Sequence, residues 1–213
     1  MNYYTLQKER YNADNYPDAG QHIMAQTHAD QVVVYQAYNR DIADYALENG
    51  VLGGQRYSFN RMSWIKPNFL WMMFRSGWAQ KEGQERILAF WIDQEFFDHI
   101  LQEAVLSSFN SSIYKDTAEW KIDLNSKEVR LQWDPDHDPY GQPINRRAIQ
   151  LGLKGQVLQA FATQSIRHIE DVTPFVLEQY EHIKNRELDK LIVPVERVYK
   201  PRSTSICKKI GID

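Results

Sequence analysis

An aromatic segment, RMSWIKPNFLWMMFRSGW at residues 61–78, holds a few cations and hydroxyls among many apolar side chains, and it contains no acid. Burying each large apolar side chain contributes about 1.5–3 kcal/mol, so most of the segment is expected in the core. Cations and hydroxyls on an aromatic wall suit a planar, anionic ligand, because a ring stacks on Trp while phosphates meet Arg and Lys. The segment therefore predicts a nucleotide-binding cleft lined by its polar residues, which are Arg61, Ser63, Lys66 and Arg75.

The sequence leaves two other uses of these cations open. Arg61 and Arg75 could pair with acids elsewhere, for instance Asp41 or Asp44, and then no ligand site forms. The segment could also line a groove for single-stranded nucleic acid, with aromatics stacking on bases and cations following the phosphates. A net charge of -3 excludes a broadly basic coat for nucleic acid but allows a local basic face. The expected ligand is a nucleotide or an NAD-like small molecule, with nucleic acid as a further partner.

A second candidate site is the loop WDPDHDP at residues 133–139, which gathers four possible metal ligands. Ligands this close could hold a hard cation such as Mg²⁺ or Ca²⁺ and serve a metal-dependent hydrolase. Asp and Pro are also common in turns for local reasons, and the calcium-loop pattern is not met. A solvated turn is therefore favoured, no metal is expected, and the hydrolase stays an alternative. The four residues are Asp134, Asp136, His137 and Asp138.

Length and composition fit a globular protein of one domain. The chain has 213 residues, of which 43% are hydrophobic and 25% charged. No uninterrupted apolar run reaches about 18 residues, so no membrane span is expected. The first residues lack the apolar core of a signal peptide. Cys207 is the single cysteine, so no disulfide can form within the chain, which fits a reducing compartment. We therefore expect a cytoplasmic protein.

The pattern of apolar residues predicts alternating strands and helices around the aromatic segment. QVVVYQAY (31–38) is rich in β-branched and aromatic residues and predicts a strand, and RDIADYALENG (40–50) predicts a helix with a glycine C-cap. RYSFNRMSWI (56–65) predicts a second strand, and NFLWMMFRSGW predicts a short helix that ends at a Ser-Gly pair. The candidate ligand residues therefore lie on a strand and at the start and end of a helix.

The rest of the chain continues as a mixture of strands and helices. The expected elements are a strand at 86–92, a helix at 93–109 with Asp93 as N-cap, a hairpin of strands 118–124 and 128–133, a strand at 146–153, and helices near 155–164 and 173–190. No linker divides the chain, so we expect one α+β domain over residues 31–200, with mixed and antiparallel sheets and short flanking helices. Residues 1–30 are predicted to be a partly ordered lead-in and residues 201–213 a basic tail.

Four blocks of the sequence resemble a widespread family of bacterial and fungal single-domain proteins that is known as a domain of unknown function. The blocks are VVVYQAYNRDIADYAL, RMSWIKPNFLWMMFRSGWAQKEGQERIL, VRLQWDPDHD and RRAIQLGL, and the likeness spans roughly residues 20–200. The run WIKPxFLWMM makes the match specific. The resemblance implies a family but no activity.

The order of elements is also similar to that of the ADP-ribosyltransferase fold. VYQAY takes the place of that superfamily's first motif, RMSWI of its second strand and RRAIQLGL of the late strand that carries a glutamate. The resemblance implies NAD as cofactor. It implies that Gln36 hydrogen-bonds a ribose hydroxyl, that the Ala37 backbone holds the carboxamide, and that Trp64 stacks on the pyridine ring. Arg61 and Lys66 would then meet the pyrophosphate.

Three positions depart from the catalytic pattern of that superfamily, namely Gln36, Ala37 and Gln150. Gln150 stands where the late strand should bring a carboxylate, and Glu196 is a substitute that nothing in the sequence brings near Trp64. The pair Arg146-Arg147 fits the related RNA 2′-phosphotransferases, which work without that acid. The hypotheses are an NAD-using transferase acting on nucleic acid or a phosphorylated end, a binding module without turnover, and the hydrolase. The predicted catalytic residues are Gln36, Trp64 and Gln150, and the predicted cofactor-binding residues are Ala37, Arg61, Ser63, Lys66, Arg75 and Arg147.

Overall fold

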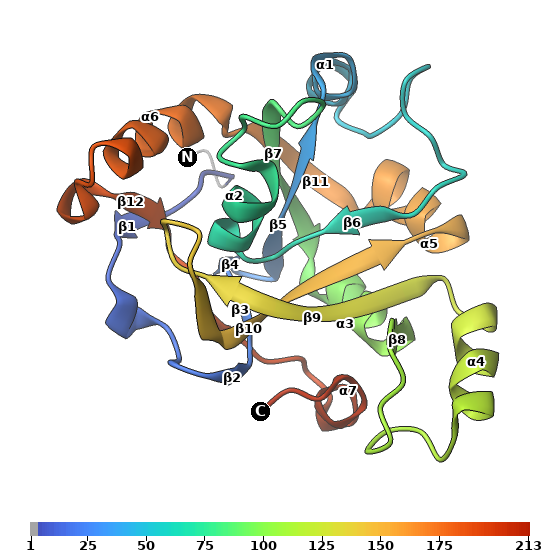
Figure 1. Ribbon diagram of the computed structural model, residues 1–213. Coiled ribbons are helices and arrows are strands. Elements are labelled where there is room, and N and C mark those ends of the chain that lie inside the picture. Colours follow the sequence, from blue (N-terminus) through green and yellow to red (C-terminus); the bar gives the residue numbers. More distant parts are fainter. Residues whose placement is uncertain (1–3) are drawn as a thin grey trace.

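The computed structural model describes residues 4–213, and two sheets organise these residues (Figure 1). The first sheet has four strands in the order β11-β7-β5-β4, and every pair is antiparallel. The strands predicted at 31–38 and 86–92 are confirmed as its two central strands, whereas β11 was not expected. The strands are β4 (Thr27–His28), β5 (Gln31–Tyr38), β7 (Arg86–Asp93) and β11 (Ile166–Asp171).

The second sheet has five strands and mixed pairing. Its main order is β2-β10-β9-β8, and β6 also pairs with β10. β9 and β6 run antiparallel to β10, while β2 is parallel to β10 and β8 is parallel to β9. The strands are β2 (Gly20–Gln21), β6 (Ser63–Ile65), β8 (Ala104–Leu106), β9 (Val129–His137) and β10 (Pro143–Leu153).

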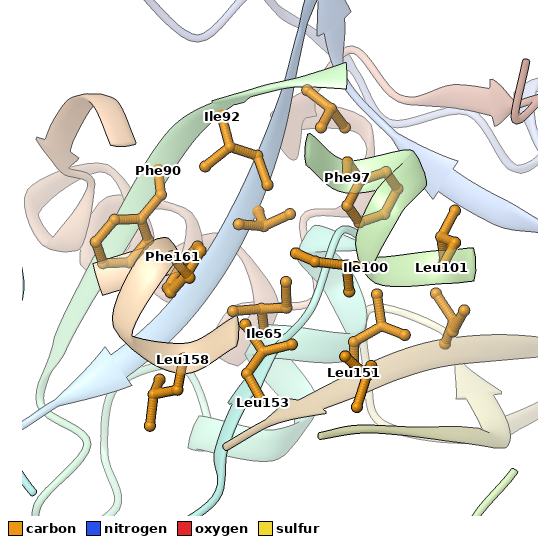
Figure 2. Close-up of a cluster of buried hydrophobic side chains, with 14 of the residues drawn as sticks. Ile65, Phe90, Ile92, Phe97, Ile100, Leu101, Leu151, Leu153, Leu158 and Phe161 are labelled. Carbon is orange, nitrogen blue, oxygen red and sulfur yellow. The ribbon is translucent and has the colours of Figure 1, made fainter. Parts of the chain in front are cut away.

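Both faces of the four-stranded sheet are buried, which explains the unbroken apolar runs of its central strands. On β5, Val32 and Val34 face one hydrophobic cluster while Val33 and Tyr35 face another. The first cluster fills the space between the two sheets, where side chains from β7, β6, β10 and α3 converge (Figure 2). The second cluster lies under helices α2 and α6. A strand that is apolar on both faces therefore buries both of them in the middle of this fold.

Within residues 4–213, seven α-helices surround the sheets. The helices are α1 (Arg40–Asn49), α2 (Phe69–Ser76), α3 (Gln94–Glu103), α4 (Thr117–Ser126), α5 (Gly155–Ala160), α6 (Thr173–Lys184) and α7 (Thr204–Ile210). A π-helical turn at Phe161–Ser165 continues α5, and short 3-10 turns lie at Ala13–Asn15 and Leu188–Lys190. Gly50 ends α1 in the left-handed conformation with φ of 68°, as predicted.

The hairpin predicted at 118–133 is wrong in its first strand, because residues 117–126 form helix α4. Its second strand, predicted at 128–133, is confirmed as part of β9. The Asp116 carboxylate accepts hydrogen bonds from the backbone N–H groups of Ala118 and Glu119, both at 2.9 Å. The Glu119 carboxylate in turn accepts the N–H of Lys115 at 2.8 Å. This pair of caps is similar to a capping box, except that Glu119 reaches the residue before the N-cap, and it starts a helix. The strand-like alternation of AEWKIDL is therefore overridden.

Three other boundaries also differ from the prediction. The strand predicted at 56–65 covers only β6, because β10 ends at Leu153 opposite Ser63 and offers no partner to residues 56–62. The helix predicted at 93–109 ends at Glu103, where the chain turns into β8 beside β9. Asp93 stands at the N-cap but makes no capping bond, since its carboxylate pairs with Arg167. The helix expected at 173–190 stops at Lys184.

The segments expected to be a lead-in and a tail carry regular structure. β1 (Lys8–Arg10) pairs with β12 (Ile192–Pro194), and β3 (Ile23–Ala25) pairs with β13 (Arg197–Tyr199). All three residues of β3 are buried, and α7 buries Ile206 and Ile210. Strand pairing between segments far apart in the sequence orders these regions, and no local sequence pattern predicts that pairing.

The predicted α+β class with mixed and antiparallel sheets is confirmed by this architecture. Within residues 4–213, none of the helices combines the length and the apolar character needed to cross a bilayer.

Candidate functional site

Strands β5 and β6 touch at a single bridge and then separate. At the bridge, Tyr35 N–H donates to the Lys66 carbonyl at 2.7 Å and Lys66 N–H donates to the Tyr35 carbonyl at 3.1 Å. One residue further on, the Gln36 side-chain amide spans the opening and donates to Ser63 Oγ at 2.8 Å and to the Trp64 carbonyl at 3.2 Å. A side chain thus replaces the backbone ladder, and a cavity of about 410 Å³ opens there.

This cavity brings together six of the nine residues that the sequence nominated. They come from two segments, β5 and the strand that enters α2, and its volume lies in the range of small-molecule sites. Gly152 of β10 makes room for the wall, because a Cβ there would come within 2.5 Å of Met62 Sδ and 3.0 Å of Trp64 Cε2. The nominated residues that line the cavity are Gln36, Ala37, Arg61, Ser63, Trp64 and Lys66.

Two tyrosines that the sequence did not nominate complete a polar network in the cavity. Tyr38 OH donates to Gln36 Oε1 at 2.5 Å, and burial raises its pKa well above the ordinary value. Tyr57 OH is buried without a hydrogen-bond partner among residues 4–213, and its ring meets that of Tyr38 edge-on at 6.2 Å. Tyr38 could have been found, because residues i and i+2 of a strand share a face. Tyr57 lies in a turn and carries no such signal.

Lys66 is the most unusual group in the cavity wall. The residue is only 7% exposed, and its Nζ donates to a single protein acceptor, the Trp64 carbonyl at 3.2 Å. It forms no ion pair with any described residue. Burial and, to a smaller extent, the nearby Arg75 cation lower its pKa to about 7, against the opposing effect of Asp134. A buried ammonium without a counter-ion is poised either to receive an anion or to stay neutral.

The position of Lys66 is set by the start of α2. Asn68 Oδ1 accepts the N–H of Trp71 at 2.6 Å as N-cap, and Glu196 Oε1 accepts the N–H of Phe69 at 2.6 Å. Glu196 is 1% exposed, and burial raises its pKa well above the ordinary value. Glu196 therefore caps the helix from the interior and does not line the cavity, so it does not take the catalytic place that the sequence left open for it.

The pairing of Arg61 and Arg75 with Asp41 or Asp44, left open by the sequence, is wrong. Asp41 pairs with Arg56 at 3.5 Å, and Asp44 pairs with Arg86 at 2.8 Å. Arg61 and Arg75 are exposed and make no ion pair within residues 4–213. Arg61 lines the cavity, whereas Arg75 lies on α2 outside its lining and acts on Lys66 through space.

Gln150 and Arg147 lie on β10 outside the cavity lining. Gln150 follows in register beside Lys66, because Leu151 pairs with Ile65. Its amide donates to Asp134 Oδ2 at 2.6 Å and to Gln132 Oε1 at 3.1 Å, so it is engaged with β9. Arg147 is exposed further along the strand.

Glu82 is the carboxylate that the described residues contribute to the cavity. It occupies a turn closed by Gln84 N–H donating to the Lys81 carbonyl at 3.0 Å, with Gly83 at φ of 73°. Just before this turn, Trp78 and Ala79 hold left-handed φ values of 57° and 63°. Each costs about 1–3 kcal/mol unless packing compensates, and the Trp78 side chain is 7% exposed. The turn brings Glu82 to the cavity from outside the nominated segment.

The solvated turn predicted at WDPDHDP is wrong for most of the segment, because residues 133–137 lie in strand β9 and only the end of the segment turns. Its acidic and histidine side chains point to separate partners. Asp136 forms a buried ion pair with Arg146 at 2.7 Å, and Asp138 Oδ1 accepts the N–H of Tyr140 at 2.9 Å in a turn. The ring of His137 stacks on Trp71, with centroids 5.5 Å apart. In the part of the chain that the structure describes, no three or more His, Cys, Asp or Glu residues gather in a way that could hold a metal ion. This geometry lends the hydrolase hypothesis no support.

Comparison with known proteins identifies a family but no activity. The family described as a domain of unknown function (DUF4291) matches residues 22–199, which is most of the chain, and the chain belongs to it. None of the curated proteins matches the sequence.

Proposed function

We propose that this DUF4291 protein binds NAD or a closely related nucleotide in the cavity between β5 and β6 and transfers its ADP-ribosyl group to an acceptor. One observation carries the proposal: six residues nominated for this ligand from sequence line one cavity, and among them is a buried lysine that has no acidic partner within residues 4–213. The similar order of elements in the ADP-ribosyltransferase fold supports the choice of NAD over other nucleotides.

Each part of such a ligand has a complementary group in the cavity. The Trp64 and Tyr57 rings suit stacking of a pyridine or adenine ring. The Arg61 guanidinium suits bidentate contact with phosphate oxygens, and the Lys66 ammonium gains the counter-ion that it lacks. Gln36 offers hydrogen bonds to ribose hydroxyls, and so does the Tyr57 hydroxyl, which has no partner among the residues that the structure describes. A ligand that satisfies an orphaned hydroxyl and a buried cation together gains affinity from both.

The transfer step breaks the bond between ribose C1′ and the nicotinamide nitrogen. The bonding electrons leave with nicotinamide, which becomes neutral, and positive charge develops on the ribosyl group. A nucleophile then bonds to C1′ and releases its proton. A fixed carboxylate stabilises the ribosyl charge, and Glu82 is the candidate in the cavity lining because Gln150 is neutral. The acceptor would be a nucleic acid, a phosphorylated end or water.

A binding module without turnover is the second candidate function. It is favoured by Gln150, whose neutral amide is tied to Asp134 and Gln132 and stands where a catalytic acid was expected. Both candidates predict nucleotide binding in the same cavity. Release of free nicotinamide from NAD⁺ separates them, since only a transferase or hydrolase produces it.

A thermal-shift titration with NAD⁺, ADP-ribose and AMP tests the proposal. A ligand that binds only the folded state adds about 2.7 kcal/mol of stability at a hundredfold its Kd. We expect a shift with NAD⁺ or ADP-ribose that is lost in Trp64→Ala and weakened in Arg61→Gln. Arg56→Gln is the matched control, because Arg56 lies five residues earlier, is exposed and does not line the cavity. Absence of a shift with every nucleotide would contradict the proposal.

A further inference from the structure

The Lys66 amine is built into the cavity in a way that leaves its lone pair available. Its single protein acceptor, the Trp64 carbonyl, also accepts a hydrogen bond from the Gln36 amide at 3.2 Å. Lys66 can therefore leave that carbonyl without stranding a buried acceptor. Lys127 differs in this respect, because its ammonium has a carboxylate partner in Glu103 at 2.7 Å.

The charged groups facing Lys66 also favour its neutral form. Arg75 approaches from α2 and repels the ammonium, while Asp134 on β9 attracts it more weakly. Gln150, its neighbour across β10, is neutral and occupied by Asp134. On the β5 side the neighbouring group is the Gln36 amide, which is also neutral. Burial and Arg75 together outweigh Asp134, and the pKa falls to about 7.

We infer that Lys66 forms a covalent imine with small carbonyl compounds that carry a phosphate or carboxylate group. The carbonyl class follows from a primary amine without a counter-ion among the described residues, on the wall of a cavity of about 410 Å³. The anionic class follows from Arg61, which lines the same cavity and has no partner among the described residues. Trp64 beside them favours a planar ligand body.

The reaction is a condensation without oxidation or reduction. The Lys66 nitrogen lone pair forms a bond to the carbonyl carbon, and the carbonyl π electrons move to oxygen. The oxygen then leaves as water. Overall, the two hydrogens of this water are the two that the neutral amine loses. The product is an imine and one molecule of water. No metal or further co-reactant enters the step.

This chemistry does not depend on the proposed NAD activity, although both use one cavity. A nucleotide phosphate against Lys66 would stabilise the ammonium form, which takes up a proton from solvent, and so would block the imine. Occupancy by NAD⁺ or ADP-ribose should therefore protect Lys66, which links the two proposals while keeping their tests separate.

The test uses pyridoxal 5′-phosphate, a planar aldehyde with a phosphate, followed by cyanoborohydride reduction and peptide mapping by mass spectrometry. We expect Lys66 to be labelled at least tenfold faster at pH 7 than Lys121, which is exposed on α4. The reason is that a pKa lowered to about 7 leaves a large fraction of Lys66 neutral at this pH, partly offset by lower basicity and restricted access. Pyridoxal without the phosphate should label Lys66 more slowly, because the contact with Arg61 is missing.

The outcomes separate the two proposals. Labelling of Lys66 no faster than Lys121 would overturn the imine inference, whatever nucleotides do. Equal labelling by pyridoxal and its phosphate would overturn the anionic class of ligand. Rapid labelling that excess NAD⁺ and ADP-ribose leave unchanged would support the imine site and count against the nucleotide proposal. In Lys66→Arg the dominant label should disappear while labelling of Lys121 stays the same.

Discussion

Replacing Lys66 with methionine is expected to stabilise the fold while weakening ligand binding. The lysine is 7% exposed, and burial lowers its pKa from 10.5 to about 7. Each pKa unit is worth about 1.4 kcal/mol, so the folded state loses about 4 kcal/mol at pH 7 relative to an unperturbed lysine. Methionine has a similar length and no charge. The Trp64 carbonyl keeps the Gln36 amide as its donor, so no buried acceptor is orphaned.

The pH dependence has a definite sign. Between pH 7 and 10.5 the unfolded chain binds a proton on Lys66 that the folded protein does not, so wild-type stability gains with rising pH in that window. Below pH 7 both states are protonated and the full penalty applies. The difference in free energy of unfolding between Lys66→Met and wild type should therefore shrink as the pH rises from 7 towards 9.

Urea denaturation at pH 7, 8 and 9 measures this difference. We expect Lys66→Met to raise the free energy of unfolding by about 2–4 kcal/mol at pH 7, after allowing for its lost hydrogen bond. Lys121→Met is the control, and a change at that exposed site should stay within about 0.5 kcal/mol. A destabilised Lys66→Met, or a difference that does not vary with pH, would refute the reasoning.

Other consequences concern three further acids and one arginine. Glu82→Gln should slow nicotinamide release from NAD⁺ about 100-fold while leaving the ADP-ribose thermal shift intact. Glu48→Gln, at an exposed position, is the control. An unchanged rate in Glu82→Gln would show that Glu82 takes no part in the reaction. Burial raises the pKa of Glu196, so the folded state holds the proton of this carboxyl more tightly than the unfolded state does. The stability of the wild type should therefore fall as the pH rises above about 4.5. Melting curves of Glu196→Gln should lack this fall. Arg146→Met leaves Asp136 buried without its 2.7 Å partner and should cost about 3–5 kcal/mol in urea denaturation, whereas a loss below about 1 kcal/mol would show that the pair is not buried in solution.

The elements that sequence could predict are those with complete local signals. β5 and α1 matched their predicted positions because a β-branched run, an Asn39 cap and a Gly50 C-cap are all local. α4 also has a local signal in Asp116 and Glu119, which cap its first turn, although the alternating pattern of residues 118–124 favours a strand. The pairing of β3 with β13 depends on contacts between distant segments, which no local pattern encodes.

The candidate site was partly predictable for the same reason. Gln36, Ser63, Trp64 and Lys66 belong to two short segments, so one contact between β5 and β6 gathers them. Tyr57 and Glu82 reach the cavity from turns whose direction is set by tertiary packing. Gln150 lies next to Lys66 in register, but a hydrogen bond to Asp134 holds its amide. The order of elements in the sequence could not show that Asp134, and not a ligand in the cavity, is the partner of this amide. The roles assigned to all of these residues stay predictions until a ligand is tested.

Isothermal titration calorimetry with NAD⁺ at pH 7, in two buffers of different ionisation enthalpy, tests the central claim most directly. Binding in the cavity should be saturable and should take up about 0.5 proton per ligand, because Lys66 is about half protonated beforehand and becomes fully protonated against the pyrophosphate. Lys66→Met should abolish that proton uptake. Absence of saturable binding, or binding with no proton uptake in the wild type, would contradict the assignment of this cavity to an NAD-type nucleotide.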